Sequence, residues 1–405
     1  MSKIIKPEVL APAGDFERLK YALMYGADAV YLGGTAFGMR ANSANFDFDT
    51  LKNSTDYAHS LGKKVYLTCN TVPTNDEADG LEDYLKNSAK CGVDAFIIAD
   101  IGVMNTAKRV APEIDIHMST QTGIMNYITA TELYKMGAKR VVLAREMPID
   151  DIKRIRDKTP ADLDIEAFVH GAMCMSFSGR CLISNFMVGR DANRGECAQP
   201  CRWKYYLMEE KRPNQYYPVF EGEDGSYILN AKDMSMIEHI DKLVDSGITS
   251  LKIEGRAKSF YYVSVIANAY RCCVDEYVKN PSSYETPKWL VDETYKVSHR
   301  EYSTGFYFGK PNQCYESGGY VREYDVIATV EGCGEGYLEL LVRNKFSTGE
   351  TAQMISPREK PVDLVIGKII DEDEGEVASA CHPMKRVKLY CDQKFPVGAI
   401  LRRER

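Results

Sequence analysis

One repeated pattern constrains the fold more than any other feature of this chain. Across residues 7–277, a short β-branched or apolar run is followed by a stretch with amphipathic helical periodicity. Helical candidates such as LEDYLKNSAKCGV and ATELYKMGA end on a glycine that suits a left-handed C-terminal cap. The strand runs are EVLAPAG, DAVYLGG, KKVYLTCN, DAFIIAD, DIHMSTQ, RVVLARE, DIEAFVHG and SLKIEGR. Eight strands alternating with helices favour an α/β fold, a TIM-type (β/α)8 barrel, over an open doubly wound sheet.

Two segments depart from the barrel pattern. Residues 174–226 form a cysteine-rich insertion after the seventh strand, so the barrel domain is expected to span residues 1–310. Beyond residue 311 the helical periodicity stops, and short alternating runs separated by turns predict a small all-β, barrel-like domain over residues 320–405. The acidic run from Asp371 to Glu376 is typical of a solvated hairpin turn.

Four cysteines gather in the insertion. They fall within 28 residues, where an even spread of the chain's 12 cysteines would place about one, and their spacing is C-x6-C-x15-C-x3-C. The first residues lack a secretory leader pattern, so we expect a cytoplasmic protein whose thiols bind metal rather than pair as disulfides. The spacing leaves zinc and an iron–sulfur cluster equally open, with buried unpaired thiols as a further alternative. The four are Cys174, Cys181, Cys197 and Cys201.

The carboxyl ends of the predicted strands carry an unusually polar set of side chains. In a closed parallel barrel these ends meet on one face, which is where barrel enzymes place their active sites. Mutual ion pairs are the alternative: Arg145 with Glu146, and Glu254 with both Lys252 and Arg256. The set comprises Gly14, Gly33, Gly34, Asn70, Asp100, Gln121, Arg145, Glu146, His170, Lys252, Glu254 and Arg256.

The stretch EAFVHGAMCMSFSGRCLIS resembles the signature of peptidase family U32. Its matching residues are Glu166, Gly171, Cys174, Gly179, Cys181 and Ser184. The opening EVLAPAGDFERLKYALMYGADAVYLGG and the later MSTQ, LAREM, RGECAQPCRW and LKIEGR fit the same family in the same order. The likeness covers nearly the whole chain and is strongest with the branch implicated in tRNA hydroxylation.

This resemblance implies a function, a cofactor and a co-substrate. Members of that branch are implicated in prephenate-dependent 5-hydroxylation of the wobble uridine of tRNA, and relatives bind a 4Fe–4S cluster through four cysteines. It therefore implies that Cys174, Cys181, Cys197 and Cys201 are cluster ligands. The two carboxylates of prephenate suit the fork-shaped guanidinium groups of Arg40, Arg145 and Arg256. Further candidates are Asn70, Gln121 and Lys252 for binding, and His170, Glu146 and Glu254 for catalysis.

Charge limits where RNA could bind. The chain carries a formal net charge of −7, so any RNA must be held by a local basic patch. Two stretches are candidates for such a patch. One mixes basic residues with aromatic rings that can stack on an unpaired base, and the other is a basic tail in the predicted β-domain. The first comprises Arg202, Trp203 and Lys204, directly after the last cysteine of the insertion; the second comprises Arg402 and Arg403 in the tail, with Lys385 nearby.

Two other functions stay open at this point. The first is a peptidase. The chain has neither the H-E-x-x-H motif of zinc proteases nor the G-x-S-x-G motif of serine hydrolases, so the peptidase would use Cys174 as its nucleophile, paired with His170. The second is a cluster-bearing scaffold that assists a partner, such as an electron donor protein or a paralogue. No run of about 18 apolar residues occurs, so no membrane partner is expected.

Overall fold

The computed structural model describes most of the chain. The described residues are 5–38, 45–174, 181–192, 195–203, 206–207, 210–211, 213–214, 217–218, 232–309, 311 and 320–405.

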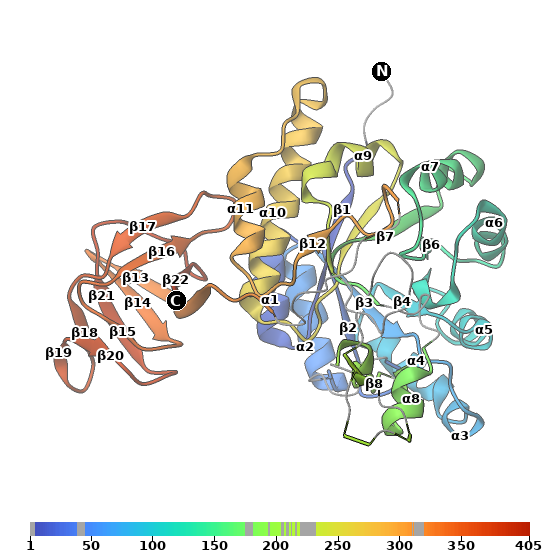
Figure 1. Ribbon diagram of the computed structural model, residues 1–405, viewed down its shortest axis with the longest axis horizontal. Helices are drawn as coiled ribbons and strands as arrows, with labels where there is room; N and C mark the ends of the chain where they lie inside the picture. Colours follow the sequence, from blue (N-terminus) through green and yellow to red (C-terminus); the bar gives the residue numbers. More distant parts are fainter. Residues whose placement is uncertain are drawn as a thin grey trace.

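Eight parallel strands close into a barrel (Figure 1). The last of them, β11, pairs with both β1 and β7, and this double pairing closes the ring. All eight runs identified in the sequence are strands, so the prediction of a TIM-type barrel is confirmed. The strands are β1 (Glu8–Pro12), β2 (Ala29–Gly33), β3 (Lys64–Cys69), β4 (Ala95–Ile98), β5 (Asp115–Met118), β6 (Arg140–Val142), β7 (Asp164–Ala172) and β11 (Ser250–Ile253).

Helices surround the barrel, and α1, α2, α5, α6 and α10 begin at side-chain caps. The Asp15 carboxylate accepts from the backbone N–H of Arg18 at 2.8 Å, satisfying a donor that the first helical turn leaves open. Gly92 follows a helix at φ +85°, as the glycine endings predicted. No helix in the described ranges is long and apolar enough to span a membrane. The helices around the barrel are α1 (Phe16–Met24), α2 (Phe48–Ser60), α3 (Asn75–Ala78), α4 (Leu81–Lys90), α5 (Ile101–Val110), α6 (Tyr127–Lys135), α7 (Ile149–Lys158), α9 (Ile240–Asp245), α10 (Phe260–Lys279) and α11 (Lys288–Tyr295).

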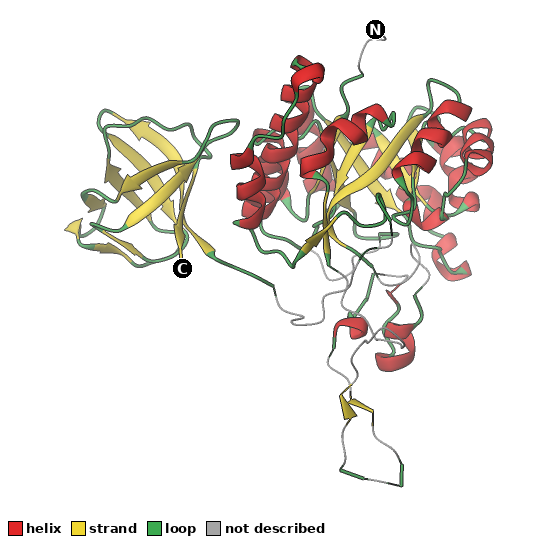
Figure 2. Cartoon of the chain, turned by 45° about the horizontal axis from the view of Figure 1, so that its top comes forward, coloured by secondary structure: helices red, strands yellow, loops and turns green. Residues whose placement is uncertain are grey.

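Two short strands extend the barrel sheet beside β7. Strand β10 (Asp233–Ser235) runs antiparallel to β7, and β12 (Tyr302–Ser303) runs parallel to β10. The insertion contributes helix α8 (Ile183–Val188), which lies beyond one end of the barrel (Figure 2). It also contributes the 3-10 helix η3 (Pro200–Arg202) and the strand pair β8 (Tyr206–Leu207) and β9 (Tyr217–Pro218). The 3-10 helices η1 (Thr120–Thr122), η4 (Ile237–His239) and η5 (Pro281–Ser283) lie elsewhere in the barrel domain.

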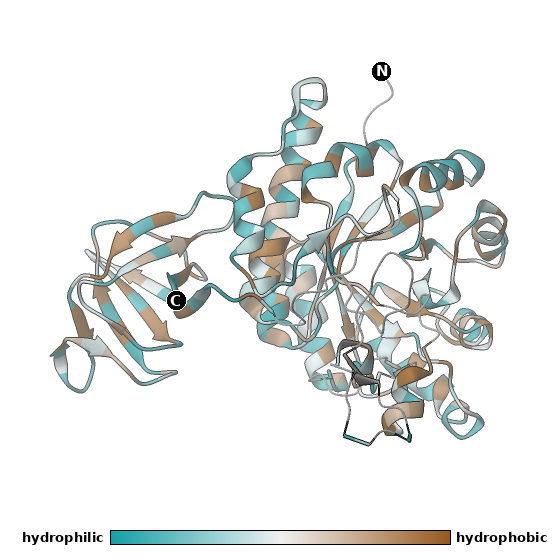
Figure 3. Ribbon diagram, viewed as in Figure 1, coloured by the Kyte–Doolittle hydropathy of each residue, from teal (hydrophilic) through white to brown (hydrophobic). Residues whose placement is uncertain are grey.

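The C-terminal part is an antiparallel β-domain with its own apolar core. Its strands alternate between buried apolar and outward polar residues, which Figure 3 displays as changes between brown and teal. The acidic run is a hairpin turn between β18 and β19, as predicted. The strands are β13 (Tyr324–Gly334), β14 (Tyr337–Val342), β15 (Phe346–Ser347), β16 (Thr351–Ile355), β17 (Val362–Val365), β18 (Ile369–Asp371), β19 (Gly375–Val377), β20 (Ser379–Ala380), β21 (Arg386–Tyr390) and β22 (Ile400–Glu404).

The two domains share a buried contact. The β-domain lies across α1, α10 and α11 from the barrel (Figure 1). The hydroxyl of Tyr25 is buried and reaches the carbonyl oxygens of Ile355 at 3.0 Å and Gly398 at 3.1 Å. Ile355 and Ile400 of the β-domain belong to the same apolar core as the barrel helices. The contact is therefore packed like a domain interior, and it fixes the β-domain beside the barrel.

Candidate functional site

A cavity of about 540 Å³ opens where the barrel strands end. Side chains from, or just beyond, strands β2 to β7 and β11 line it, because parallel barrel strands all finish on one face. The face predicted from the strand ends therefore exists as a single pocket. Lining residues from that predicted set are Asn70, Gln121, Arg145, Glu146, Lys252, Glu254 and Arg256.

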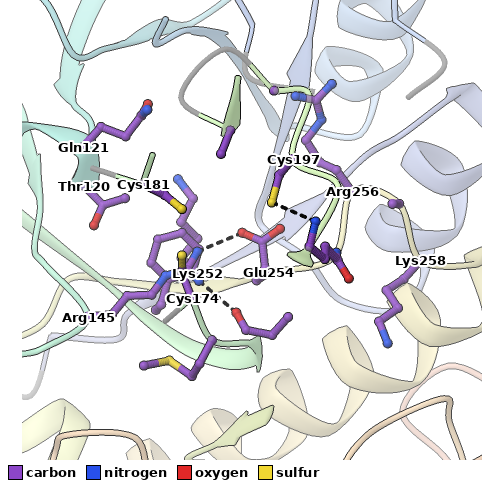
Figure 4. A pocket seen from close by; sticks show the side chains of 18 of the residues that line it. Thr120, Gln121, Arg145, Cys174, Cys181, Cys197, Lys252, Glu254, Arg256 and Lys258 are labelled. Carbon is purple, nitrogen blue, oxygen red and sulfur yellow. Dashed lines mark hydrogen bonds and ion pairs between the residues drawn. The ribbon is translucent and has the colours of Figure 1, made fainter. Parts of the chain in front are cut away.

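All four cysteines of the insertion line this same pocket. Cys174 follows the last residue of β7 by two positions, Cys181 precedes α8, and Cys201 lies in η3. Figure 4 shows the sulfurs of Cys174, Cys181 and Cys197 around one space, with Glu254 beside them. The backbone N–H of Gln199 donates to Cys197 Sγ at 3.3 Å. The four thiols of the insertion thus reach the mouth of the barrel together.

The spacing of the four cysteines left a zinc ion and an iron–sulfur cluster as alternatives, and the two place different demands on their sulfur ligands. Among the described residues, no three histidine, cysteine or acidic side chains lie close enough to hold one ion. A structural zinc site needs four ligands around a single atom. A 4Fe–4S cluster takes one thiolate on each of four irons, so its ligands surround a larger body and need not meet at a point. Four cysteine sulfurs that line one pocket are a donor set that a 4Fe–4S cluster can use.

The floor of the pocket is a buried ion network. Lys252 Nζ lies 2.6 Å from Glu166 Oε1, and Arg140 Nη1 lies 3.0 Å from Glu166 Oε2. Burial pushes the pKa of the Glu166 carboxyl up, but Lys252 and Arg140 outweigh burial and leave that pKa below its ordinary value. Lys252 therefore pairs with Glu166 inside the barrel. The alternative of a Lys252 pair with Glu254 is not what the structure contains.

Arg145 joins the strand ends to the cysteine insertion. Its Nη2 lies 2.9 Å from Glu254 Oε2, and its Nη1 donates to the carbonyl of Ala172 at 2.8 Å. The guanidinium carbon sits 3.8 Å from the centroid of the Phe168 ring. Ala172 is two residues before Cys174, so this one side chain ties Glu254 to the backbone that delivers the first cysteine. Arg145 forms an ion pair with Glu254, whereas the alternative drawn from the sequence paired it with Glu146.

Arg256 needs a glycine beside it. A Cβ atom on Gly33 would lie 2.3 Å from Arg256 Nη2, so the guanidinium rests directly on the glycine backbone. Its Nη2 also donates to Asn45 Oδ1 at 3.1 Å. Any side chain at position 33 would displace Arg256 from the pocket wall.

Two amide side chains bring polar atoms without partners to the lining. Within the described part of the chain, Asn70 Oδ1 and Gln121 Oε1 are buried and have no hydrogen-bond partner. A buried polar atom is costly to leave unpaired, so such atoms mark where a ligand would complete the hydrogen bonding.

Comparison with known proteins places the whole chain in one family. The model described as Peptidase family U32 matches residues 14–317, and the Peptidase family U32 C-terminal domain matches residues 322–402. The chain belongs to peptidase family U32. A U32 relative from Bacillus subtilis, named tRNA hydroxylation protein P1, is 38% identical over 98% of this chain and 95% of its own length.

Other relatives carry related names. The Escherichia coli protein named tRNA hydroxylation protein P is 35% identical over 88% of this chain and 87% of its own. The Escherichia coli 23S rRNA 5-hydroxycytidine synthase is 32% identical over 88% of this chain and 57% of its own. The resemblance to the tRNA-hydroxylating branch of family U32 is thereby confirmed.

His170 is buried and is not among the residues that line the pocket of this U32 protein, so the pocket gives its predicted catalytic role no support. A register shift between β7 and β11 falls directly after the Phe168–Lys252 pair, and the imidazole then packs against Tyr262 and Tyr270 of α10. Its ring nitrogens lie 3.4 Å from the Tyr270 hydroxyl and 3.3 Å from the Tyr302 hydroxyl. The imidazole is thus committed to a tyrosine cluster behind the barrel wall, and the Cys174–His170 pair of a peptidase is not formed.

Burial also changes the titration of His170. Desolvation, aided by Lys258 and His299, lowers its pKa to about 3. The unfolded chain binds this proton below about pH 6.5 and the folded chain does not, so stability is full above that pH and falls as the pH drops. We expect the wild type to lose about 2 kcal/mol more stability between pH 7 and pH 5 than the His170→Gln variant. Urea midpoints at both pH values measure this, and equal losses would contradict the burial of a neutral imidazole.

The tail prediction is also corrected. Arg402 is fully buried, and its guanidinium pairs with both carboxylate oxygens of Glu293 at 2.6 and 2.7 Å, so it cannot contact RNA. Arg403 is partly exposed and pairs with Glu350 at 2.5 Å. Lys385 pairs with Asp371, Asp373 and Glu374 beside the acidic hairpin. Three carboxylates around one ammonium make Lys385 a poor phosphate ligand.

Some of the residues predicted to bind substrate or RNA lie outside the described part of the chain. Arg40 and Lys204, and the side chain of Arg202, lie outside the described residues. Trp203 follows η3 and is 44% exposed. Contact of Trp203 with RNA stays a prediction.

Sequence reasoning missed several pocket residues. Lys258 follows β11 by five residues and could have been read as part of the functional face. Tyr320 and Arg322 carry no local signal, because they reach the pocket only through the chain's return from the barrel towards the β-domain.

Proposed function

We propose that this protein hydroxylates carbon 5 of the wobble uridine in tRNA, with prephenate as co-substrate and a 4Fe–4S cluster bound by Cys174, Cys181, Cys197 and Cys201. One observation carries the proposal: four cysteines and a cluster of cations line the same pocket at the barrel mouth. The names of the U32 relatives, tRNA hydroxylation proteins and an rRNA 5-hydroxycytidine synthase, supply the substrate class.

The chemistry explains why a cofactor is needed. Placing a hydroxyl group on a ring carbon is an oxidation, and protein side chains do not carry electrons for it. The bound cluster would supply one-electron redox chemistry. The chain's own residues bind and orient: Arg145 and Arg256 present guanidinium groups that suit carboxylates. Glu146 and Glu254 line the pocket and can accept or return a proton near the reacting base.

The function is tested by nucleoside mass spectrometry of tRNA from a strain that lacks the gene. We expect the 5-hydroxyuridine-derived nucleosides to disappear and to return with the wild-type gene. Purified protein, with and without its cluster, is then assayed on tRNA lacking the modification. A cluster-loaded protein that modifies such tRNA only when a partner is added is a scaffold rather than the hydroxylase.

The metal is tested separately. Anaerobically purified protein should be brown and contain about four irons per chain. A colourless protein that holds one tightly bound zinc would refute the cluster.

Arg145 gives a residue-level test of the pocket. Lysine keeps the charge but cannot contact Glu254 and the Ala172 carbonyl in a planar fork while stacking on Phe168. We therefore expect the Arg145→Lys variant to lose at least about tenfold in hydroxylation, equivalent to about 1.4 kcal/mol. Iron content and the far-ultraviolet circular dichroism spectrum should stay those of the wild type. Wild-type hydroxylation by this variant would remove Arg145 from the proposed machinery.

A further inference from the structure

One wall of the pocket mouth comes from the chain that joins the two domains. Tyr320 and Arg322 line the same pocket as the four cysteines. Between them, Val321 forms an antiparallel bridge with His299, with N···O distances of 2.8 and 3.3 Å. Arg322 Nε donates to Ser298 Oγ at 3.3 Å. Residues 320–322 are therefore fastened to the barrel at the rim of the pocket.

Tyr320 orders two cations at this rim. Lys258 Nζ lies 3.9 Å from the centroid of the Tyr320 ring, and Arg300 Cζ lies 4.5 Å from it. Lys258 Nζ also donates to the Ser298 carbonyl at 2.8 Å. A cation held over an aromatic ring gains about 0.5–1 kcal/mol at an exposed site. The ammonium of Lys258 is thus held in place before any ligand arrives, which lowers the entropy cost of binding.

The charge of the pocket lining is opposite to that of the chain. Within the lining, five cations face two carboxylates, although the whole chain has a net charge of −7. This local excess selects an anionic ligand. The cations are Arg145, Lys252, Arg256, Lys258 and Arg322, and the carboxylates are Glu146 and Glu254.

Depth separates these cations into two groups. Lys252 and Arg256 are buried in the pocket and are contacted by Glu166 and Asn45 there. Lys258 is half-buried and Arg322 is exposed, and both stand at the mouth. A small dianion that enters the pocket would meet the inner group. Cations at the mouth instead match a polymer whose charges remain outside while one unit enters, as the phosphates of RNA do.

We propose that Lys258 and Arg322, ordered by Tyr320, bind the phosphates that flank the nucleotide entering the pocket. This inference rests on the proposed function, and it places the RNA backbone on the wall formed by residues 320–322, beside the cysteine-bearing insertion. Tyr320 acts as a positioning residue for Lys258.

The test measures binding of unmodified tRNA to the full-length, cluster-loaded protein over a range of salt concentrations. We expect Lys258→Gln and Arg322→Gln each to weaken binding by about 3–10-fold near 0.1 M salt. Each should also flatten the plot of log affinity against log salt by about 0.7–0.9, the value of one phosphate contact. Lys139→Gln is the matched control: it removes a lysine just before β6, at the opposite end of the barrel, and should leave affinity and slope unchanged. Wild-type affinity and slope in both wall variants would overturn the proposal.

Tyr320 supplies a second, independent comparison. The Phe variant keeps the ring under Lys258 and should bind as the wild type, whereas the Ala variant should weaken binding about as much as Lys258→Gln. If the wall variants bind tRNA normally but raise the KM of the small co-substrate, these cations bind its carboxylates and the proposal is wrong. The two proposals can also fail separately. If Lys258→Gln and Arg322→Gln weaken tRNA binding, but deletion of the gene leaves tRNA hydroxylation intact, then the phosphate-binding proposal is supported and the proposed function is refuted.

Discussion

Replacement of Arg402 by methionine is expected to lower the free energy of unfolding by about 3 kcal/mol, the lower end of the range for breaking a buried ion pair. The guanidinium is fully buried between the domains, where it binds both oxygens of Glu293 and the hydroxyl of Tyr261 at 2.9 Å. Its loss leaves the buried Glu293 carboxylate with Lys296, whose ammonium lies 2.9 Å from Oε1. That remaining partner is why the lower end of the range applies.

Two further variants test whether the stability lost in Arg402→Met comes from the unpaired buried charge or from the loss of packing contacts. Adding Glu293→Leu to Arg402→Met removes the stranded carboxylate and should restore most of the lost stability. Arg405→Met breaks an exposed pair with Asp325 and should cost far less stability than Arg402→Met, because solvent screens the exposed pair. Urea denaturation followed by circular dichroism gives the three values. A double variant no more stable than Arg402→Met would show that the ion pair is not the source of the loss.

The barrel could be predicted because its signals are local. The AFII core of DAFIIAD is apolar throughout, as strands covered on both faces must be. The periodicity of LEDYLKNSAKCGV places Leu81 and Leu85 on one buried helix face. The glycine that ends each such helix lies within a few residues of the helix's last buried positions. Patterns of this kind need no knowledge of distant parts of the chain.

The misplaced site residues depend on partners that are distant in sequence. Arg402 stands in LRRER, which looks like a solvated tail, but Glu293 is 109 residues away and converts it into a buried contact between domains. His170 lies two residues before the end of β7, yet the register shift beside it turns its ring towards α10. Strand ends predict which residues reach the mouth of a barrel. They do not predict on which side of an irregular strand a given ring will lie.

Replacing any one of the four insertion cysteines with serine is expected to reduce the iron content from about four per chain to nearly none. Serine is a poor, hard ligand in place of a soft thiolate, and a cluster with a missing ligand is exposed at the open mouth of the pocket. Hydroxylation of tRNA should fall below detection in the same variants. Cys381→Ser is the matched control, because Cys381 is an exposed thiol in the β-domain, outside the pocket lining.

The four variants also test each ligand separately. Cys174, Cys181, Cys197 and Cys201 all line the pocket, so the losses should be equal among them and absent in the control. A Cys201→Ser protein that keeps four irons would assign the fourth ligand to another residue, because the remaining three thiols cannot supply one for each iron. Loss of iron with wild-type hydroxylation in all four variants would remove the cluster from the mechanism and leave the pocket's cations and carboxylates as its chemistry.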